Sequence, residues 1–362
     1  MPAELVQVSP EQPEPEIIGR AAALIRSGQL VAFPTETVYG LGANAFDAEA
    51  VARIFAAKGR PSADPIIVHC AGELSEDVVN WTQLSETARR SAQALMAAFM
   101  PGALTLVLPR GRRIPPIVTA GLASVGVRVP AHPVAQALIA AAGVPIAAPS
   151  ANRFAYTSPT TAQHVYADLS EQIELILDGG ATDVGVESSI LDLCSAPPRL
   201  LRHGGVPLEA LQACLAAAGL PETIQVMARY AAADAEALPA PGMLLKHYAP
   251  RAALTLYESA DEMQLRAALR AEARRRAAVE RVGLLLAAED APFLADLPNV
   301  CVEIVGSLND LAGVAHNLYA ALRALDDQGV ACILARSFPE AGIGAAVRDR
   351  LLRAASGRVV SL

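Results

Sequence analysis

Apolar and polar positions follow two periods along the chain, one typical of helices and one of strands. Short apolar runs bounded by Gly and Pro predict buried strands, and apolar residues three and four positions apart predict amphipathic helices. In the first 219 residues we expect helices at 15–27, 48–59, 75–99, 132–143, 158–169 and 207–219. We expect strands at 30–34, 65–70, 104–109, 124–130, 144–152, 174–180, 188–193 and 198–205. Because strands outnumber helices, the pattern predicts an α/β fold of the α+β kind, a twisted mixed sheet with flanking helices.

The pattern changes after residue 219. AAADAEALPAPGM (231–243) is rich in Ala and Pro and has no periodicity, which predicts a linker. From residue 253, strand and helix patterns alternate again and predict a smaller, Rossmann-like α/β unit. The expected organisation is a catalytic domain at 1–219, a linker at 220–252 and a C-terminal domain at 253–362.

Composition narrows the class of protein. The chain has 362 residues, of which 53% are hydrophobic and 18% charged, so it can bury two cores. No apolar run approaches the ~20 residues that a membrane span needs, and the N-terminus has no signal-peptide pattern. The five cysteines are scattered and form no C-x-x-C pair, which argues against a disulfide framework or zinc knuckle. We therefore expect a cytoplasmic protein with no membrane partner.

The charges suggest a site for a small anion rather than a surface for nucleic acid. The net charge is -8, whereas proteins that hold RNA through its phosphates are usually basic. Of 29 basic residues only two are lysine, Lys58 and Lys246. A lysine kept in an arginine-rich chain suggests a position that needs a compact ammonium group, although retention by chance explains it as well.

Candidate chemistry gathers where predicted strands end. FPTETVYGLGANAFD (33–47) carries two hydroxyls and a carboxylate directly after a strand, the sheet edge at which α/β folds bind ligands. KGRPSADP (58–65) places a lysine and an arginine in one loop, which suits a phosphate or carboxylate. APSAN (148–152) and SPTT (158–161) add small polar groups, and Ser158 and Pro159 fit the N-cap and first position of a helix. A structural turn and ordinary capping are the simpler explanations of these segments.

Further candidates are GVESS (185–189), LRHGG (201–205), His69 and Arg128, an arginine between valines that must face solvent or a polar cleft. The sequence contains no nucleophile–histidine arrangement and no H-E-x-x-H motif. Hydroxyls and cations without a nucleophile favour catalysis by positioning and charge neutralisation, as nucleotidyl transfer requires.

Six ordered motifs resemble those of the YrdC/Sua5 family: FPTETVYGLGA, AAKGRPSADPIIVH, VGVRVP, APSAN, GVESSILDL and LLRHGG. HYAP (247–250) and the C-terminal α/β unit resemble its longer, Sua5-type members. The resemblance implies L-threonylcarbamoyladenylate synthase activity, in which L-threonine, bicarbonate and ATP give threonylcarbamoyl-AMP and pyrophosphate. Mg²⁺ would accompany ATP. The product would supply downstream tRNA machinery that modifies the adenosine at position 37 of tRNAs reading ANN codons.

The resemblance also implies residue roles. Lys58 and Arg60 would be catalytic and would contact the ATP phosphates. L-threonine would be bound by Thr35, His69, Arg128, Ser150 and Ser188. The remaining ATP contacts would come from Ser62, Asn152, Ser158, Thr160, Arg202 and Tyr248. Because a labile carbamate and a reactive adenylate both need water kept out, we also hypothesise that the linker 231–250 is a lid, in which Lys246 would approach phosphate or product.

Two other functions remain open at this point. The same fold could bind double-stranded RNA or tRNA on a basic face, which the low isoelectric point disfavours. The chain could also form a carbamoyl-adenylate, as the related domain of hydrogenase-maturation carbamoyltransferases does. The zinc-finger and acylphosphatase-like parts of those proteins have no counterpart in this sequence.

Overall fold

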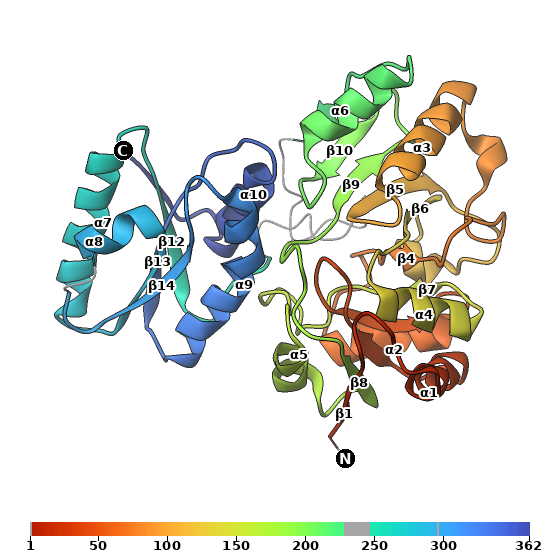
Figure 1. Ribbon diagram of the computed structural model, residues 1–362, viewed down its shortest axis with the longest axis horizontal. Helices are drawn as coiled ribbons and strands as arrows, with labels where there is room; N and C mark the ends of the chain where they lie inside the picture. Colours follow the sequence, from red (N-terminus) through yellow and green to blue (C-terminus); the bar gives the residue numbers. More distant parts are fainter. Residues whose placement is uncertain (1, 228–246, 295–296) are drawn as a thin grey trace. The chain divides into compact units, whose positions relative to one another are not determined.

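The computed structural model describes residues 2–227, 247–294 and 297–362, and the chain forms two compact units (Figure 1). The first unit comprises Met1–Phe154 and Ser158–Met243. The second comprises Leu244–Leu362 and a short excursion of the chain, Ala155–Thr157. Among the described residues, no helix combines the length and apolar character that a membrane crossing needs.

The first unit is built on one mixed sheet of eleven strands in the order β1-β8-β2-β3-β7-β4-β6-β5-β9-β10-β11. The sheet contains both parallel pairs, such as β4 with β6, and antiparallel pairs, such as β2 with β3. The strands are β1 (Glu4–Gln7), β2 (Val31–Phe33), β3 (Gly40–Asn44), β4 (Val68–His69), β5 (Leu104–Pro109), β6 (Ser124–Arg128), β7 (Ile146–Ala147), β8 (Leu175–Asp178), β9 (Ser189–Asp192), β10 (Arg199–Arg202) and β11 (Gln225–Val226). The mixed sheet predicted from the sequence is confirmed.

Helices cover this sheet through two separate apolar clusters. The helices are α1 (Pro15–Arg26), α2 (Ala48–Lys58), α3 (Glu86–Phe99), α4 (Pro133–Ala142), α5 (Ala162–Leu169) and α6 (Leu208–Ala217), with short 3-10 turns η1 (Trp81–Gln83) and η2 (Pro116–Thr119). Apolar side chains of α1 and α4 pack with Val31 and Phe33 of β2. Those of α2, α3, α5 and α6 belong to the other cluster, which contains Ala32. Since neighbouring side chains of a strand point to opposite faces, β2 is covered on both.

Local sequence explains how α2 brings its last residue to the site. Asp47 begins the helix, because its carboxylate accepts hydrogen bonds from the amides of Glu49 and Ala50. Gly59 ends it with a φ of 62°, a left-handed conformation that costs glycine little. The turn therefore fixes Lys58 as the last helical residue, directly ahead of the loop that carries Arg60.

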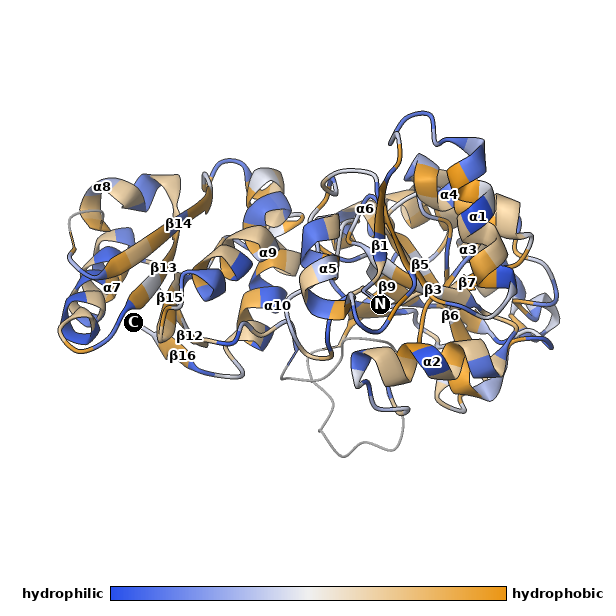
Figure 2. Cartoon of the chain, turned by 90° about the horizontal axis from the view of Figure 1, so that it is seen from below, coloured by the Kyte–Doolittle hydropathy of each residue, from blue (hydrophilic) through white to orange (hydrophobic). Residues whose placement is uncertain are grey.

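The second unit is a five-stranded parallel sheet in the order β14-β13-β15-β12-β16. Figure 1 shows α7 and α8 on one side of this sheet and α9 and α10 on the other, which is the doubly wound arrangement expected from the sequence. Figure 2 shows apolar residues along its strands and mixed faces on its helices. Its strands are β12 (Ala253–Glu258), β13 (Val282–Ala287), β14 (Val300–Gly306), β15 (Cys332–Arg336) and β16 (Val359–Ser361), and its helices are α7 (Glu262–Ala277), η3 (Ala288–Asp290), α8 (Ala291–Leu294), α9 (Leu311–Asp327) and α10 (Gly344–Ala354).

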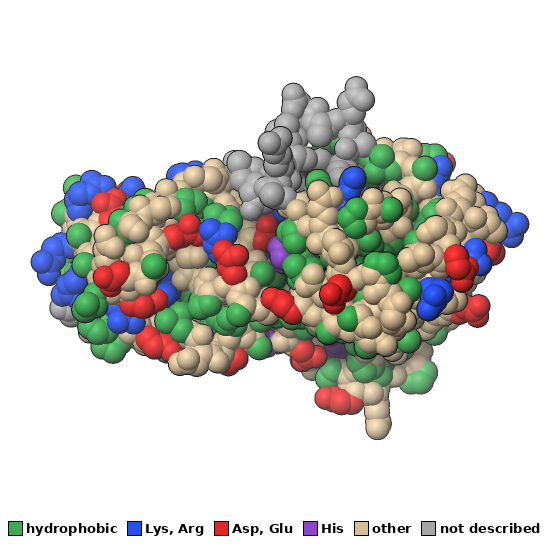
Figure 3. Space-filling view, turned by 90° about the horizontal axis from the view of Figure 1, so that it is seen from above, with side chains coloured by type: hydrophobic (Ala, Val, Ile, Leu, Met, Phe, Trp, Pro, Cys, Tyr) green, Lys and Arg blue, Asp and Glu red, His purple; other side chains and the backbone are tan. Residues whose placement is uncertain are grey.

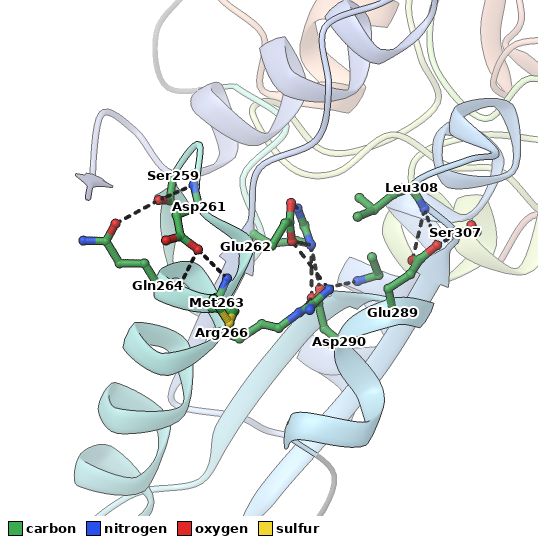
Figure 4. A network of polar contacts seen from close by, with 12 residues as sticks. Ser259, Asp261, Glu262, Met263, Gln264, Arg266, Glu289, Asp290, Ser307 and Leu308 are labelled. Carbon is green, nitrogen blue, oxygen red and sulfur yellow. Dashed lines mark hydrogen bonds and ion pairs between the residues drawn. The ribbon is translucent and has the colours of Figure 1, made fainter.

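Ion pairs fill the edge of this second sheet where its parallel strands end (Figure 4). Arg336, the last residue of β15, contacts both Glu262 at 2.8 Å and Asp290 at 3.0 Å. Arg266 of α7 donates to the same Asp290 carboxylate at 2.9 Å. The Asp290 and Arg336 side chains are 0% and 3% exposed. The network lies at the edge where doubly wound sheets usually bind ligands. Basic side chains also gather over α7 on the surface (Figure 3).

Several predictions about elements were wrong or incomplete. Strands β1 and β3 were not expected, and the strands expected at 65–70 and 144–152 cover only 68–69 and 146–147. The helix expected at 75–99 begins only at Glu86, because Ser85 caps it and residues before it form turns and η1. The helix expected from 158 begins at Ala162, and its N-cap is Thr161 rather than Ser158, whose hydroxyl bonds to a carboxylate instead. Residues 225–226, which we had assigned to the linker, pair with β10 as β11.

Candidate active site

The first group of predicted site residues lies where strands β2, β4 and β6 end. Thr35 follows β2 closely, while His69 and Arg128 are the last residues of β4 and β6. His69 and Arg128 are also partners in the parallel pairing of these two strands. All three side chains are buried, and together with Glu36 and Thr37 they form a polar cluster, which we call the Arg128 pocket.

Arg128 is held by partners on three sides. Its Nη2 forms an ion pair with Glu36 Oε1 at 2.7 Å, and its Nη1 donates to Thr37 Oγ1 at 2.9 Å. Its Nε donates to the backbone carbonyl of Gly102 at 3.1 Å. Thr37 Oγ1 lies 2.8 Å from Thr35 Oγ1, which extends the chain of polar contacts to the predicted threonine-binding residue. The guanidinium is therefore fixed in orientation before any substrate arrives.

Burial and the ion pair act on the ionisable groups of this pocket in opposite directions. Burial alone would raise the pKa of Glu36, but the Arg128 charge and its hydrogen bonds bring this pKa below its ordinary value. Burial, and then the Arg128 charge, lower the pKa of His69 to about 3. At neutral pH the pocket thus contains an ionised carboxylate, a guanidinium and an uncharged imidazole.

Lys58 joins the helix α2 to the APSAN turn. Its Nζ donates to the backbone carbonyls of Ser150 and Asn152, each at 2.5 Å. The backbone carbonyl of Lys58 accepts a hydrogen bond from Phe154 N at 2.9 Å. Lys58 is 5% exposed, and burial followed by the nearby Arg60 charge holds the pKa of its amine well below the usual value. The amine of Lys58, a residue predicted to contact the ATP phosphates, therefore holds the turn predicted to bind threonine through Ser150 and ATP through Asn152.

The two candidate residues in the loop after α2 differ in burial and in contacts. Arg60 is 8% exposed, forms an ion pair with Asp64 at 3.0 Å and donates to the carbonyl of Pro65 at 2.6 Å. Ser62 lies at the exposed tip of the same loop. The guanidinium of Arg60 is anchored within its own loop, whereas Ser62 lies open to solvent.

A third group forms around the start of β9. Ser188 Oγ lies 2.7 Å from Thr105 Oγ1, and its backbone carbonyl accepts hydrogen bonds from both Nε and Nη2 of Arg202. Ser158 Oγ donates to the neighbouring Glu187 at 2.5 Å. The end of β10 and the turn before α5 thus converge on residues 187–188.

Two backbone contacts link these groups. Tyr39 N donates to the carbonyl of Pro159, and Ala151 N donates to the carbonyl of Tyr39. Thr160, 4% exposed, belongs to the same segment, and its carbonyl accepts a hydrogen bond from Thr182 N. The chain turns at 35–39, 150–152 and 158–160 are therefore joined directly within the first unit.

One predicted residue belongs to the second unit, and another lies outside the described residues. Tyr248 belongs to the second unit, where it is 1% exposed and its ring centroid lies 4.1 Å from that of His247. Lys246, and with it most of the expected lid, lies outside the described residues. The roles of both residues stay predictions.

Sequence reasoning gave no role to several side chains that organise this site. Glu36, Thr37 and Glu187 stand within the quoted motifs, next to residues that were chosen. Thr105 lies inside the apolar strand LTLVLP, where its hydroxyl is the only polar side chain and is buried. A buried polar side chain needs a partner, so Thr105 was the one position with a usable signal.

The assembled groups define a site for an anionic substrate. Lys58, Arg60 and Arg202 are buried basic side chains: Lys58 ends helix α2, Arg202 ends strand β10, and an ion pair with Asp64 anchors Arg60 within its loop. Within the described ranges no cluster of three or more His, Cys, Asp or Glu side chains could hold a metal ion by itself. The chemistry that these protein groups offer is orientation and neutralisation of negative charge.

Comparison with known proteins identifies the family. Residues 23–204 match the Sua5_yciO_yrdC family model, described as telomere recombination. Residues 206–356 match the Sua5_C model, described as the C-terminal domain of threonylcarbamoyl-AMP synthase. The chain belongs to the Sua5/YrdC family and has the two-domain architecture of its Sua5-type members, as its motifs predicted.

Relatives match over nearly the whole chain. A protein of Bacillus subtilis named threonylcarbamoyl-AMP synthase is 43% identical over 346 residues, covering 95% of this chain and 94% of the relative. A Pyrococcus abyssi protein of the same name is 41% identical over 342 residues, covering 94% and 95%. The structure of P. abyssi Sua5 complexed with L-threonine matches with a TM-score of 0.86 and 39% identity, covering 99% of this chain and 100% of that one.

Proposed function

We propose that this chain is an L-threonylcarbamoyladenylate synthase, which converts L-threonine, bicarbonate and ATP to threonylcarbamoyl-AMP and pyrophosphate. The observation that carries the proposal is the convergence of Lys58 on the carbonyls of Ser150 and Asn152. This convergence occurs in a chain that aligns almost end to end with relatives bearing that name.

The Arg128 pocket is the proposed threonine site. Arg128 binds the carboxylate of threonine, and its orientation is supported by Glu36 and Thr37. Uncharged His69 and the Thr35 hydroxyl line the same pocket, with Ser150 and Ser188 as the remaining proposed contacts. Because the imidazole of His69 is uncharged at neutral pH, it adds no positive charge beside the amine of threonine.

The Lys58 region is the proposed ATP site. An ammonium group has three donors, and two of those of Lys58 are used by carbonyls, so one remains for a phosphate oxygen. Arg60 and Arg202 add positive charge, and Ser62, Asn152, Ser158, Thr160 and Tyr248 are the other proposed contacts. Mg²⁺ enters with the nucleotide, because it usually binds through substrate phosphates and few protein ligands.

The reaction follows from these two sites. The amine of threonine attacks CO₂ derived from bicarbonate and loses a proton, giving a carbamate. A carbamate oxygen then attacks the α-phosphorus, forms the P–O bond and expels pyrophosphate. Lys58 and Arg60 neutralise charge that builds on the phosphates. The product supplies the threonylcarbamoyl group for the adenosine at position 37 of tRNAs reading ANN codons, through separate transfer machinery.

One assay tests the proposal. The purified chain is incubated with ATP, Mg²⁺ and bicarbonate, with and without L-threonine, and pyrophosphate release is measured. We expect release only when threonine is present, and a product with the mass of threonylcarbamoyl-AMP. Release that carbamoyl phosphate supports and threonine does not would assign the chain to carbamoyl-adenylate formation instead.

A further inference from the structure

Helix α9 of the second unit places three large polar side chains on one buried face. Tyr319, Arg323 and Asp326 are spaced four and three residues apart, which puts them in line along a helix. They are 0%, 4% and 9% exposed. Burying a carboxylate and a guanidinium is costly unless each has partners, so their contacts decide what this face does.

The Asp326 carboxylate joins two distant segments of the chain. Its Oδ2 accepts hydrogen bonds from the Tyr156 hydroxyl at 2.9 Å and from Arg251 N at 2.8 Å. Its Oδ1 accepts one from Ala252 N at 3.0 Å. One carboxylate thus holds Tyr156 of the 155–157 excursion and the backbone that directly follows HYAP.

The other residues of this face bind the same two segments. Arg323 Nη2 donates to the carbonyl of Thr157 at 2.6 Å, and its guanidinium carbon lies 4.6 Å from the centre of the Tyr156 ring. The Tyr319 ring centroid lies 5.9 Å from that of Tyr248 in HYAP. Ala249 N donates to the carbonyl of Ala155 at 2.9 Å, so the two segments also bind each other directly.

Both segments adjoin residues of the proposed ATP site. Residues 155–157 stand between Asn152 and Ser158, and Arg251 and Ala252 come shortly after Tyr248. We propose that Asp326 is a positioning residue, which fixes the 155–157 excursion against the chain after HYAP and so orders both nucleotide-binding segments before ATP binds. This inference rests on the proposed function, in which the second unit would order the nucleotide-binding segments.

The expected effect is on nucleotide affinity. If the contacts of Asp326 are lost, the two segments become ordered only when ATP binds. The entropic cost of ordering them then lowers the apparent affinity for ATP. The proposed threonine site is organised by other contacts, those of Arg128 with Glu36, Thr37 and the carbonyl of Gly102. The inference therefore predicts that the KM values of the two substrates respond differently.

The test uses the full chain with Asp326→Asn and, as its matched control, Asp327→Asn. Asp327 is the next residue, its side chain is 74% exposed, and it forms only a surface pair with Arg251 at 3.1 Å. We expect the KM for ATP to rise about tenfold in Asp326→Asn, as for loss of one charge-assisted hydrogen bond. The KM for threonine should change less than about twofold, and Asp327→Asn should match the parent.

A second variant guards against misfolding. Tyr156→Phe removes only the hydroxyl, so it should raise the KM for ATP in the same direction, and the double variant Tyr156→Phe/Asp326→Asn should lose less than the sum of the two. Unchanged ATP affinity in Asp326→Asn and Tyr156→Phe, or equal rises in both KM values, would overturn the inference. Binding of a non-hydrolysable ATP analogue, compared between Asp326→Asn and Asp327→Asn, tests it even if the parent chain shows no threonine-dependent reaction.

Discussion

The guanidinium of Arg128 and the carboxylate of Glu36 form an ion pair at 2.7 Å inside the first unit, with side chains that are 5% and 10% exposed. A buried charge without a partner lowers the stability of the fold, so each of these two charges offsets the cost of burying the other. The pair also sets the direction in which Arg128 can meet a substrate carboxylate. It links the turn after β2 to the end of β6, because Glu36 Oε2 accepts from Ala131 N at 3.0 Å.

Glu36→Gln should therefore weaken threonine binding. The amide keeps the shape of the side chain but loses the charge, so we expect the KM for threonine to rise about ten- to a hundredfold, as for loss of one charged hydrogen bond. Steady-state kinetics with varied threonine measure this. Glu4→Gln, which alters a pair with Arg20 at the surface, should leave the KM unchanged. Equal kinetics in both variants would show that Glu36 does not orient Arg128.

Lys58 should not be replaceable by arginine. Two backbone carbonyls at 2.5 Å accept from one compact ammonium, and a buried planar guanidinium has neither the size nor the geometry to take its place. We expect Lys58→Met to lower kcat about 10²- to 10³-fold, as for loss of one charge-stabilising donor, and Lys58→Arg to recover little. Pyrophosphate release at saturating substrate measures both. Near-parental activity of Lys58→Arg would contradict the role of this geometry.

His69 should make the fold less stable in acid. Its pKa is about 3 in the folded chain and about 6.5 when unfolded, so between these values only the unfolded chain binds the proton. The free energy of unfolding should therefore fall as pH drops from about 6.5 towards 3, by up to about 1.4 kcal/mol per pH unit. Urea unfolding at several pH values measures this slope. His69→Gln should have a shallower slope, and equal slopes would show that His69 titrates normally.

Gly204→Ala should destabilise the first unit. A methyl group at this position would lie 2.3 Å from backbone atoms of Glu187, Ser188 and Ser189, and none of them can move as a flexible side chain could. We expect a loss of at least about 1–3 kcal/mol, as for overpacking, measured by urea unfolding. Gly72→Ala is the control, because nothing lies within 4 Å of its added methyl. Equal stability of the two variants would show that the backbone at 187–189 can shift to accommodate the added methyl group at little cost in free energy.

The sequence predicted most elements because their signals were local. The helix α2 has an Asp47 cap and a terminal Gly59, and its observed bounds follow from those two residues. The strand β5 matches the expected range 104–109, an apolar run that ends in proline. By contrast, Ser158 and Thr161 are both able to cap a helix. Only the distant Glu187, which engages the Ser158 hydroxyl, decides between them.

The same distinction between local and distant signals applies to the site residues. Motifs drew attention to Lys58 and Arg128, but their partners depend on which strands are neighbours in the sheet. The Glu36–Arg128 pair joins residues 92 positions apart, and the contact of Lys58 with Asn152 spans 94. No periodicity encodes such distances. The position of Tyr248 within the second unit likewise depends on α9, whose buried polar face resembles an ordinary amphipathic pattern in the sequence.

The ion-pair network at the strand ends of the second sheet has one further consequence. Arg336, Arg266, Asp290 and Glu262 carry two positive and two negative charges that already satisfy one another. A charged metabolite of either sign would have to break a matched pair before it gained one. The second unit therefore has a doubly wound fold of the kind that often binds ligands at this sheet edge, but the charged side chains there are already paired with one another.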